Sequence, residues 1–79
     1  MDQLREAIRK LRAGDWDGAH DIAQNDSSLQ GAWLHGIIHL IEGDVGNAQY
    51  WYARAGRTCP SPNQIESELE AFELPATDD

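Results

Sequence analysis

Three residues on one predicted helix combine side chains that can bind a metal ion or transfer a proton. His35, His39 and Glu42 are spaced at i, i+4 and i+7, which places them within roughly 60° on one helical stripe. Two imidazoles four residues apart can share a metal ion, and a carboxylate one turn further can complete three ligands. His20, on the preceding predicted helix, is a candidate for a fourth ligand. Helical zinc proteases have Glu directly after the first His, and here Gly36 occupies that position.

The same histidines have a second interpretation as structural residues inside the fold. Apolar residues cover most of their helix, as is typical of a helix packed on both sides: Trp33, Leu34, Ile37, Ile38, Leu40 and Ile41. Buried imidazoles are normally hydrogen-bonded, and the polar groups close in sequence are Glu42, Asp44, Asn47, Tyr50 and Tyr52. We therefore expect His35 and His39 to lie in a buried polar network. A ligand or partner pocket and a metal or catalytic site are the alternatives.

The elements that position these residues are predicted to be helices throughout. Hydrophobic spacing and end signals indicate helices at about 2–13, 15–24, 29–42, 45–56 and 62–73. Gly14 and Gly43 suit the left-handed position that ends a helix, and Asp2, Asp15 and Asp44 suit helix N-caps. Pro75 is expected to end the last helix. No segment shows the two-residue alternation of a strand, so the predicted fold class is all-α.

The chain repeats part of its pattern at an interval of 29 residues. Gly14-Asp15 and Ala19 return as Gly43-Asp44 and Ala48, and the same offset relates Leu4, Ala7, Ile8 and Leu11 to Trp33, Gly36, Ile37 and Leu40. A short helical hairpin cannot bury its apolar face alone. We therefore expect two stacked antiparallel hairpins, about 2–25 and 29–57, and a C-terminal amphipathic capping helix at about 62–73. Residues 1–74 then form one domain, and 75–79 form an acidic, flexible tail.

The second hairpin carries the positions of a known helical repeat. Gly43-Asp44, Ala48, Tyr52, Ala55 and Pro60, with Gly36 on the preceding helix, resemble the tetratricopeptide repeat over about Leu29 to Pro60. The interval of 29 departs from the 34 residues of that repeat, and Trp33 lies one position late. The resemblance implies a helical module that binds a protein segment. The block from Trp33 to Gly56 also resembles one in small bacterial proteins, and that resemblance implies no function.

Charge excludes several classes of partner. The 79 residues contain 6 Lys+Arg and 14 Asp+Glu, which gives a net charge of −8. This argues against non-specific nucleic-acid binding and against docking on anionic lipid. The chain lacks an apolar stretch of membrane-spanning length, and its single cysteine, Cys59, allows no internal disulfide. We expect a cytoplasmic protein.

The charge is also divided along the chain. Four of the six bases lie in the first predicted helix (Arg5, Arg9, Lys10 and Arg12), whereas the chain from Ser61 onward has six acids and no base. These ends can be two solvated faces, or they can attract each other within one chain or between copies. Arg54 and Arg57 suit the C-terminal end of their helix, with a carboxylate clamp as the alternative. The aromatic residues Trp16, Trp33, Tyr50, Trp51 and Tyr52 are expected in the core, with an exposed docking patch as the alternative.

Three functions of different classes fit these observations. We favour an interaction module with a protein or peptide partner. The second is a small metal- or ligand-binding protein, or an enzyme, and the third is a structural subunit that self-assembles, for instance as a homodimer. The candidate binding residues are His20, His35, His39, Glu42, Trp33, Tyr50 and Arg54. The sequence assigns no catalytic residue and no cofactor.

Overall fold

The computed structural model describes residues 2–78, with side chains from Gln3 to Glu73. It contains five α-helices: α1 (Asp2–Arg12), α2 (Trp16–Gln24), α3 (Leu29–Ile41), α4 (Val45–Arg54) and α5 (Ile65–Asp78). A short 3-10 turn, Pro62–Gln64, precedes α5. The described residues include no strand, so the all-α prediction is confirmed.

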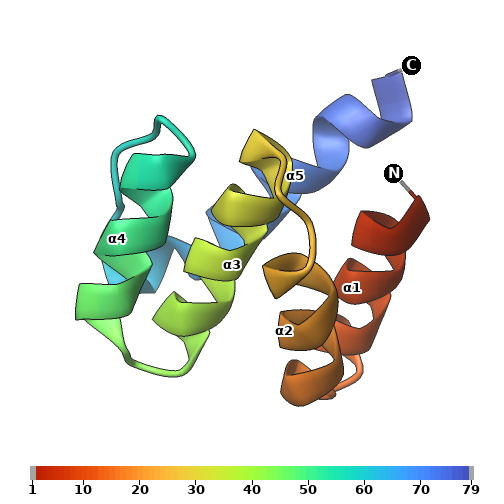
Figure 1. Ribbon diagram of the computed structural model, residues 1–79, viewed down its shortest axis with the longest axis horizontal. Coiled ribbons are helices and arrows are strands. Elements are labelled where there is room, and N and C mark those ends of the chain that lie inside the picture. The colour runs from red at the N-terminus through yellow and green to blue at the C-terminus, as the bar shows by residue number, and fades with distance from the viewer. Residues whose placement is uncertain (1, 79) are drawn as a thin grey trace.

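The two helical hairpins repeat the same turn geometry. Gly14 and Gly43 have φ angles of 89° and 80°, in the left-handed region that an L side chain rarely adopts. Asp15 and Asp44 then cap α2 and α4 with closely similar backbone angles, φ −90° and ψ 74° against φ −95° and ψ 76°. α1 packs on α2, and α3 packs on α4 (Figure 1). The 29-residue interval in the sequence is therefore a repeated structural unit.

The core is centred on α3, which is held between α2 and α4. Every residue from Gly31 to Ile38 is buried, because α3 has packing partners on both sides. The positions that the repeat relates between the two hairpins are buried in both copies: Leu4, Ala7, Ile8 and Leu11, and Trp33, Gly36, Ile37 and Leu40. Ser28 begins α3 by accepting a hydrogen bond from the Gly31 amide at 3.0 Å. The central helix is the element that positions the histidines.

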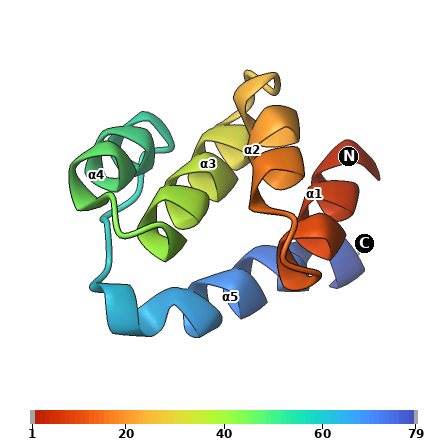
Figure 2. The ribbon, with the colours of Figure 1, turned by 90° about the horizontal axis from the view of Figure 1, so that it is seen from below.

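Helix α5 crosses one face of the row formed by α1 to α4 (Figure 2). Glu68 of α5 accepts hydrogen bonds from Trp33 Nε1 at 3.0 Å and from the Tyr52 hydroxyl at 2.8 Å. Leu69 and Phe72 add apolar packing, and the Phe72 ring lies edge-on to Trp33 with centroids 4.9 Å apart. α5 is thus the predicted cap, fixed by one half-buried carboxylate and two apolar side chains.

The first and last helices also contact each other through charge. Arg12 of α1 donates to Glu73 at 3.0 Å and to Glu66 at 3.2 Å, both on α5. Of the two alternatives for the basic and acidic ends, attraction within one chain is therefore the one that Arg12 makes. Because these groups are solvent-exposed, each pair contributes no more than about 1 kcal/mol to stability.

Two sequence expectations about helix ends differ from the structure. α5 continues past Pro75 to Asp78, although a proline inside a helix removes one backbone hydrogen bond. Asp2 is already helical, and its side chain is not among those described. Asp79, the end of the predicted tail, lies outside the described residues. Within residues 2–78, no helix combines the length and hydropathy needed to cross a bilayer.

The expectation that all five aromatic residues lie in the core is wrong for two of them. Trp33 and Tyr52 are buried and Trp51 is half-buried, whereas Trp16 is 44% and Tyr50 is 54% exposed. α4 is the last helix of its row, so its side away from α3 and α5 is uncovered, and Tyr50 is exposed there. Trp16 is the first residue of α2, beside the exposed Gly14 turn.

Candidate functional site

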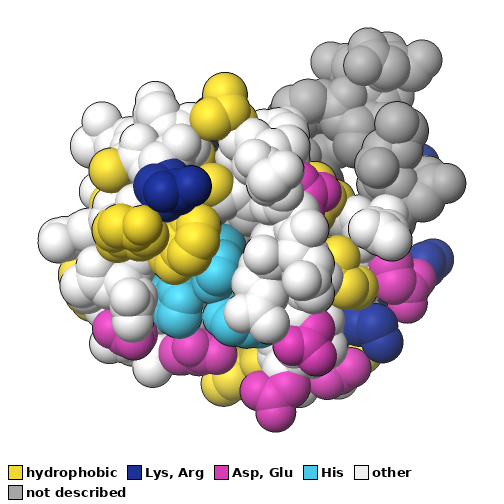
Figure 3. Space-filling model, in the orientation of Figure 1, with side chains coloured by type: hydrophobic (Ala, Val, Ile, Leu, Met, Phe, Trp, Pro, Cys, Tyr) yellow, Lys and Arg dark blue, Asp and Glu magenta, His cyan; other side chains and the backbone are white. Residues whose placement is uncertain are grey.

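The three histidines of the chain meet at the contact between the two hairpins. His20 comes from α2, and His35 and His39 come from α3. One ring nitrogen from each histidine lies within 4.8 Å of the others. Figure 3 shows the histidine side chains together on one face, with hydrophobic side chains on one side and acidic side chains on the other. We call His20, His35 and His39 the histidine cluster.

The rings of the cluster are in direct contact. The Nε2 atoms of His20 and His35 are 2.9 Å apart, so one imidazole donates a hydrogen bond to the other. The rings of His35 and His39 stack at an interplanar angle of 19°, with centroids 4.9 Å apart. His20 lies edge-on to both rings. This arrangement comes from helical spacing on α3 and from the packing of α2 against it.

His35 is held as a neutral imidazole. It is 4% exposed, and burial lowers its pKa from 6.5 to about 4, helped by the charged forms of His20 and His39. At pH 7 the ring therefore keeps a nitrogen lone pair, which is the form that binds metal ions. The sequence indicated His35 as a ligand candidate, whereas its protonation state follows from the fold.

The histidines lie in a polar cluster, as expected, but none of the partners expected for them from the sequence hydrogen-bonds to them. Nδ1 of His35 and Nδ1 of His39 are buried and have no hydrogen-bond partner among the described residues. Glu42 and Asp44 lie beside His39 without hydrogen-bonding to it, and the other three expected partners are engaged elsewhere. The Tyr52 hydroxyl donates to Glu68, the Asn47 amide donates to Asp44, and the Tyr50 hydroxyl accepts from Arg54. Two buried imidazole nitrogens are thus left without the partner that such atoms normally have.

Carboxylates border the cluster where α3 turns into α4. Glu42 Oε1 lies 3.4 Å from His39 Nδ1, without the geometry of a hydrogen bond, and Asp44 Oδ2 lies 4.0 Å from the same nitrogen. Glu42 was predicted as a third ligand. In the structure the three converging donors are the histidines. Glu42 is not one of them and lies beside His39.

Aromatic and cationic side chains of α4 border the cluster on the other side. The Trp51 ring stacks on His35 at an interplanar angle of 15°, with centroids 4.0 Å apart. Arg54 lies above the rings of Trp51 and Tyr50, with its Cζ atom 5.4 Å and 5.8 Å from their centroids. Tyr50 and Arg54 were predicted site residues and lie beside the cluster. Trp51 was predicted only as a core aromatic residue. Its contact with His35 depends on how α4 packs on α3, which residue spacing along the sequence does not indicate.

Trp33 is the one predicted site residue that belongs to another group. Its ring contacts Phe72 and Glu68 of α5, and the Arg57 guanidinium lies 3.5 Å from its centroid. These contacts make Trp33 part of the attachment of α5.

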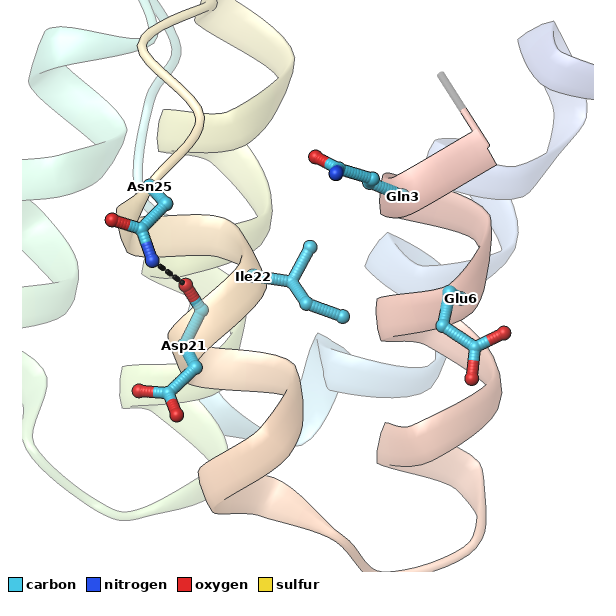
Figure 4. A pocket seen from close by; sticks show the side chains of 5 residues that line it. All are labelled: Gln3, Glu6, Asp21, Ile22 and Asn25. Atoms are coloured by element: carbon cyan, nitrogen blue, oxygen red, sulfur yellow. Dashed lines mark hydrogen bonds between the residues drawn. The ribbon is translucent and has the colours of Figure 1, made fainter.

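A separate open groove of about 270 Å³ lies between α1 and α2, lined by Gln3, Glu6, Asp21, Ile22 and Asn25 (Figure 4). None of the predicted site residues lines it.

Comparisons of this chain with protein-family models, with curated proteins and with solved structures find no match. The function must therefore be argued from the geometry of the described residues. Among them, the histidine cluster has the most specific chemistry.

Proposed function

We propose that this chain is a small helical metal-binding protein whose ligands are His20, His35 and His39. One observation carries the proposal: three ring nitrogens from two hairpins lie within 4.8 Å of one another. Neutral imidazoles are common ligands of Zn²⁺ and of Cu, Ni and Fe ions. The donor set therefore favours a transition metal over Mg²⁺ or Ca²⁺, which prefer oxygen ligands.

The spacing of the donors suits one shared ion. Zn–N bonds measure about 2.0–2.1 Å, so two imidazole nitrogens on one tetrahedral ion lie about 3.3 Å apart. The Nε2 atoms of His20 and His35, at 2.9 Å, need to separate only slightly to reach this value. The two ring nitrogens that lie farthest apart, at up to 4.8 Å, need to move closer. Both adjustments require small rotations of the histidine side chains.

The surroundings of the cluster support a bound cation. Glu42 and Asp44 place negative charge beside His39, and a carboxylate next to a ligating imidazole raises its basicity. Two buried nitrogens of the cluster, Nδ1 of His35 and Nδ1 of His39, lack hydrogen-bond partners. A metal ion bound to the cluster would be a partner for imidazole lone pairs. With three protein ligands, a fourth coordination position stays open to water or to another molecule.

The experiment is calorimetric titration of chelator-stripped protein with ZnCl₂ at pH 7.5. The expected result is one equivalent of Zn²⁺ with a micromolar or lower dissociation constant. His20→Asn should weaken binding by at least tenfold, because it removes one of three ligands. Asp21→Asn is the matched control: it changes the next residue of α2, an exposed one, and should leave the affinity unchanged. Absence of micromolar binding by the wild-type chain would exclude the proposal.

A second candidate is the interaction module, which is favoured by the exposed face of α4. Tyr50 is 54% exposed, and Arg54 is ordered above it, so an aromatic and a cationic group lie together on the surface. Tyrosine and arginine are enriched at protein interfaces. Tyr50→Ala should reduce capture of a partner while leaving zinc affinity unchanged, which separates this candidate from the metal site.

A further inference from the structure

The histidine cluster has an acidic and a cationic end. α3 and α4 are antiparallel and are joined by the turn at residues 42–44. The C-terminal end of α4 is therefore the end that lies farthest from this turn. Glu42 and Asp44 lie at the turn, beside His39. Trp51 stacks on His35, and Arg54 follows Trp51 by three residues, about 4.5 Å further along the helix axis. A metal ion would therefore lie between a negative turn and a positive group.

Arg54 differs from the paired bases of α1. Arg9, Lys10 and Arg12 each have a carboxylate within 4.0 Å. Among the described residues, no carboxylate lies within that distance of Arg54, although the chain contains 14 Asp+Glu. Its guanidinium is instead positioned by the Tyr50 hydroxyl, at 3.4 Å, and by the faces of two aromatic rings. A guanidinium held in this way keeps its donors available for an external carboxylate.

The metal ion itself would also attract an anion. Three neutral imidazoles leave the double charge of the ion uncompensated, and the fourth position needs one more ligand. Glu42 and Asp44 repel an anion that approaches from the turn. An anion therefore approaches from the side of Trp51 and Arg54, where the positive charge is.

We propose that the metal site binds a small organic dicarboxylate, with one carboxylate as the fourth metal ligand and the other on Arg54. Two separate positive centres, the metal ion and the guanidinium, are complementary to two negative groups in one molecule. The Trp51 ring connects the two centres: it stacks on His35, and the Arg54 guanidinium lies over it with Cζ 5.4 Å from the ring centroid. This inference rests on the metal site proposed above and assigns its ligand.

The test uses the Co²⁺-loaded protein, because the visible d–d spectrum of Co²⁺ reports a change of the fourth ligand. Succinate, glutarate and acetate are titrated separately, and the band shift gives each dissociation constant. We expect a dicarboxylate to bind at least tenfold more tightly than acetate. Arg54→Gln should weaken dicarboxylate binding roughly ten- to hundredfold, which is the effect of losing one charge-assisted interaction. The same variant should weaken acetate binding much less, because acetate has no second carboxylate to bind Arg54.

Two further variants keep the test specific. Arg9→Gln removes the same charge from an exposed position of α1 and should not alter dicarboxylate binding. Arg54→Lys keeps the charge without the planar fork and should give an intermediate affinity. Helical content, measured by circular dichroism, checks that each variant is folded.

The possible failures can be told apart. If the wild-type chain does not bind Co²⁺, the metal site itself is wrong. If Co²⁺ binds but no carboxylate shifts the spectrum, the ligand class is wrong. If Arg54→Gln binds dicarboxylates as tightly as the wild type, the second carboxylate does not bind Arg54, and the proposal is overturned.

Discussion

The Nε2 atoms of His20 and His35 lie 2.9 Å apart, although the two residues belong to different hairpins. Two imidazolium rings cannot make this contact, because both nitrogens would then be donors. The hydrogen bond therefore requires at least one neutral ring. It also links α2 to α3, so any change in the protonation or ligation of these rings acts on the packing of the two hairpins.

Acid should weaken the fold through His35. Its pKa is about 4 in the folded chain and near 6.5 when unperturbed, so between these values the unfolded chain binds a proton that the folded chain does not. The free energy of unfolding therefore falls as pH drops through this window, by about 3 kcal/mol in total from this residue. Urea denaturation at pH 7 and pH 4 measures the change. His35→Gln should make the loss smaller, and an equal loss in the variant would show that other groups cause it.

Zinc should stabilise the folded chain, because the ligands come from both hairpins and are brought together only by folding. At a free Zn²⁺ concentration one hundred times the dissociation constant, the gain is about 2.7 kcal/mol, or roughly 10–20 °C in melting temperature. Thermal melts with Zn²⁺ and with a chelator measure the difference. His20→Asn should reduce the gain to about 1.4 kcal/mol or less, because tenfold weaker binding lowers the ratio of free Zn²⁺ to dissociation constant to about ten. An undiminished gain in this variant would mean that Zn²⁺ binds elsewhere.

Tyr52→Phe should destabilise the protein by about 1.5–3 kcal/mol, because it removes a hydrogen bond to the half-buried carboxylate of Glu68. Burial, together with the hydrogen bond to Glu68, raises the pKa of the Tyr52 hydroxyl, which therefore stays protonated and donates at any physiological pH. Tyr50→Phe is the matched control, since Tyr50 is exposed and its change should alter stability by less than about 0.5 kcal/mol. Denaturant melts compare the two. Equal effects would show that the contact with Glu68 contributes nothing.

Two glycines of the second hairpin should respond to alanine in opposite directions. A Cβ at Gly36 would lie 2.6 Å from Cδ1 of the buried Tyr52 ring, so Gly36→Ala should cost about 1–3 kcal/mol. A Cβ at Gly46, in the first turn of α4, meets nothing within 4 Å, so Gly46→Ala should stabilise by about 0.5–1 kcal/mol. Chemical denaturation of both variants tests the pair. A stable Gly36→Ala would show that α3 and α4 can move apart without loss.

The site illustrates how far sequence patterns reach. The spacing of His35 and His39 on one helix predicts that they share a stripe, and they do stack in the structure. The third member, His20, belongs to another helix, and its distance from them depends on how α2 packs on α3. No spacing in the sequence encodes that packing. The same limit explains the error at Glu42. It lies one turn from His39 and was expected among the ligands, but it contacts His39 and does not converge with the three histidines.

Local interactions are what the sequence alone determined. Helix ends at Gly14 and Gly43, the caps at Asp15 and Asp44, and the 29-residue repeat follow from backbone preferences and apolar spacing within a few residues. The tertiary structure decided which polar group each side chain meets. Glu68, on α5 and sixteen residues from Tyr52, accepts the hydrogen bond of the Tyr52 hydroxyl. Tyr52 therefore does not donate this hydrogen bond to a histidine. Only packing of distant segments makes that choice, and it leaves Nδ1 of His35 and Nδ1 of His39 without a hydrogen-bond partner among the described residues.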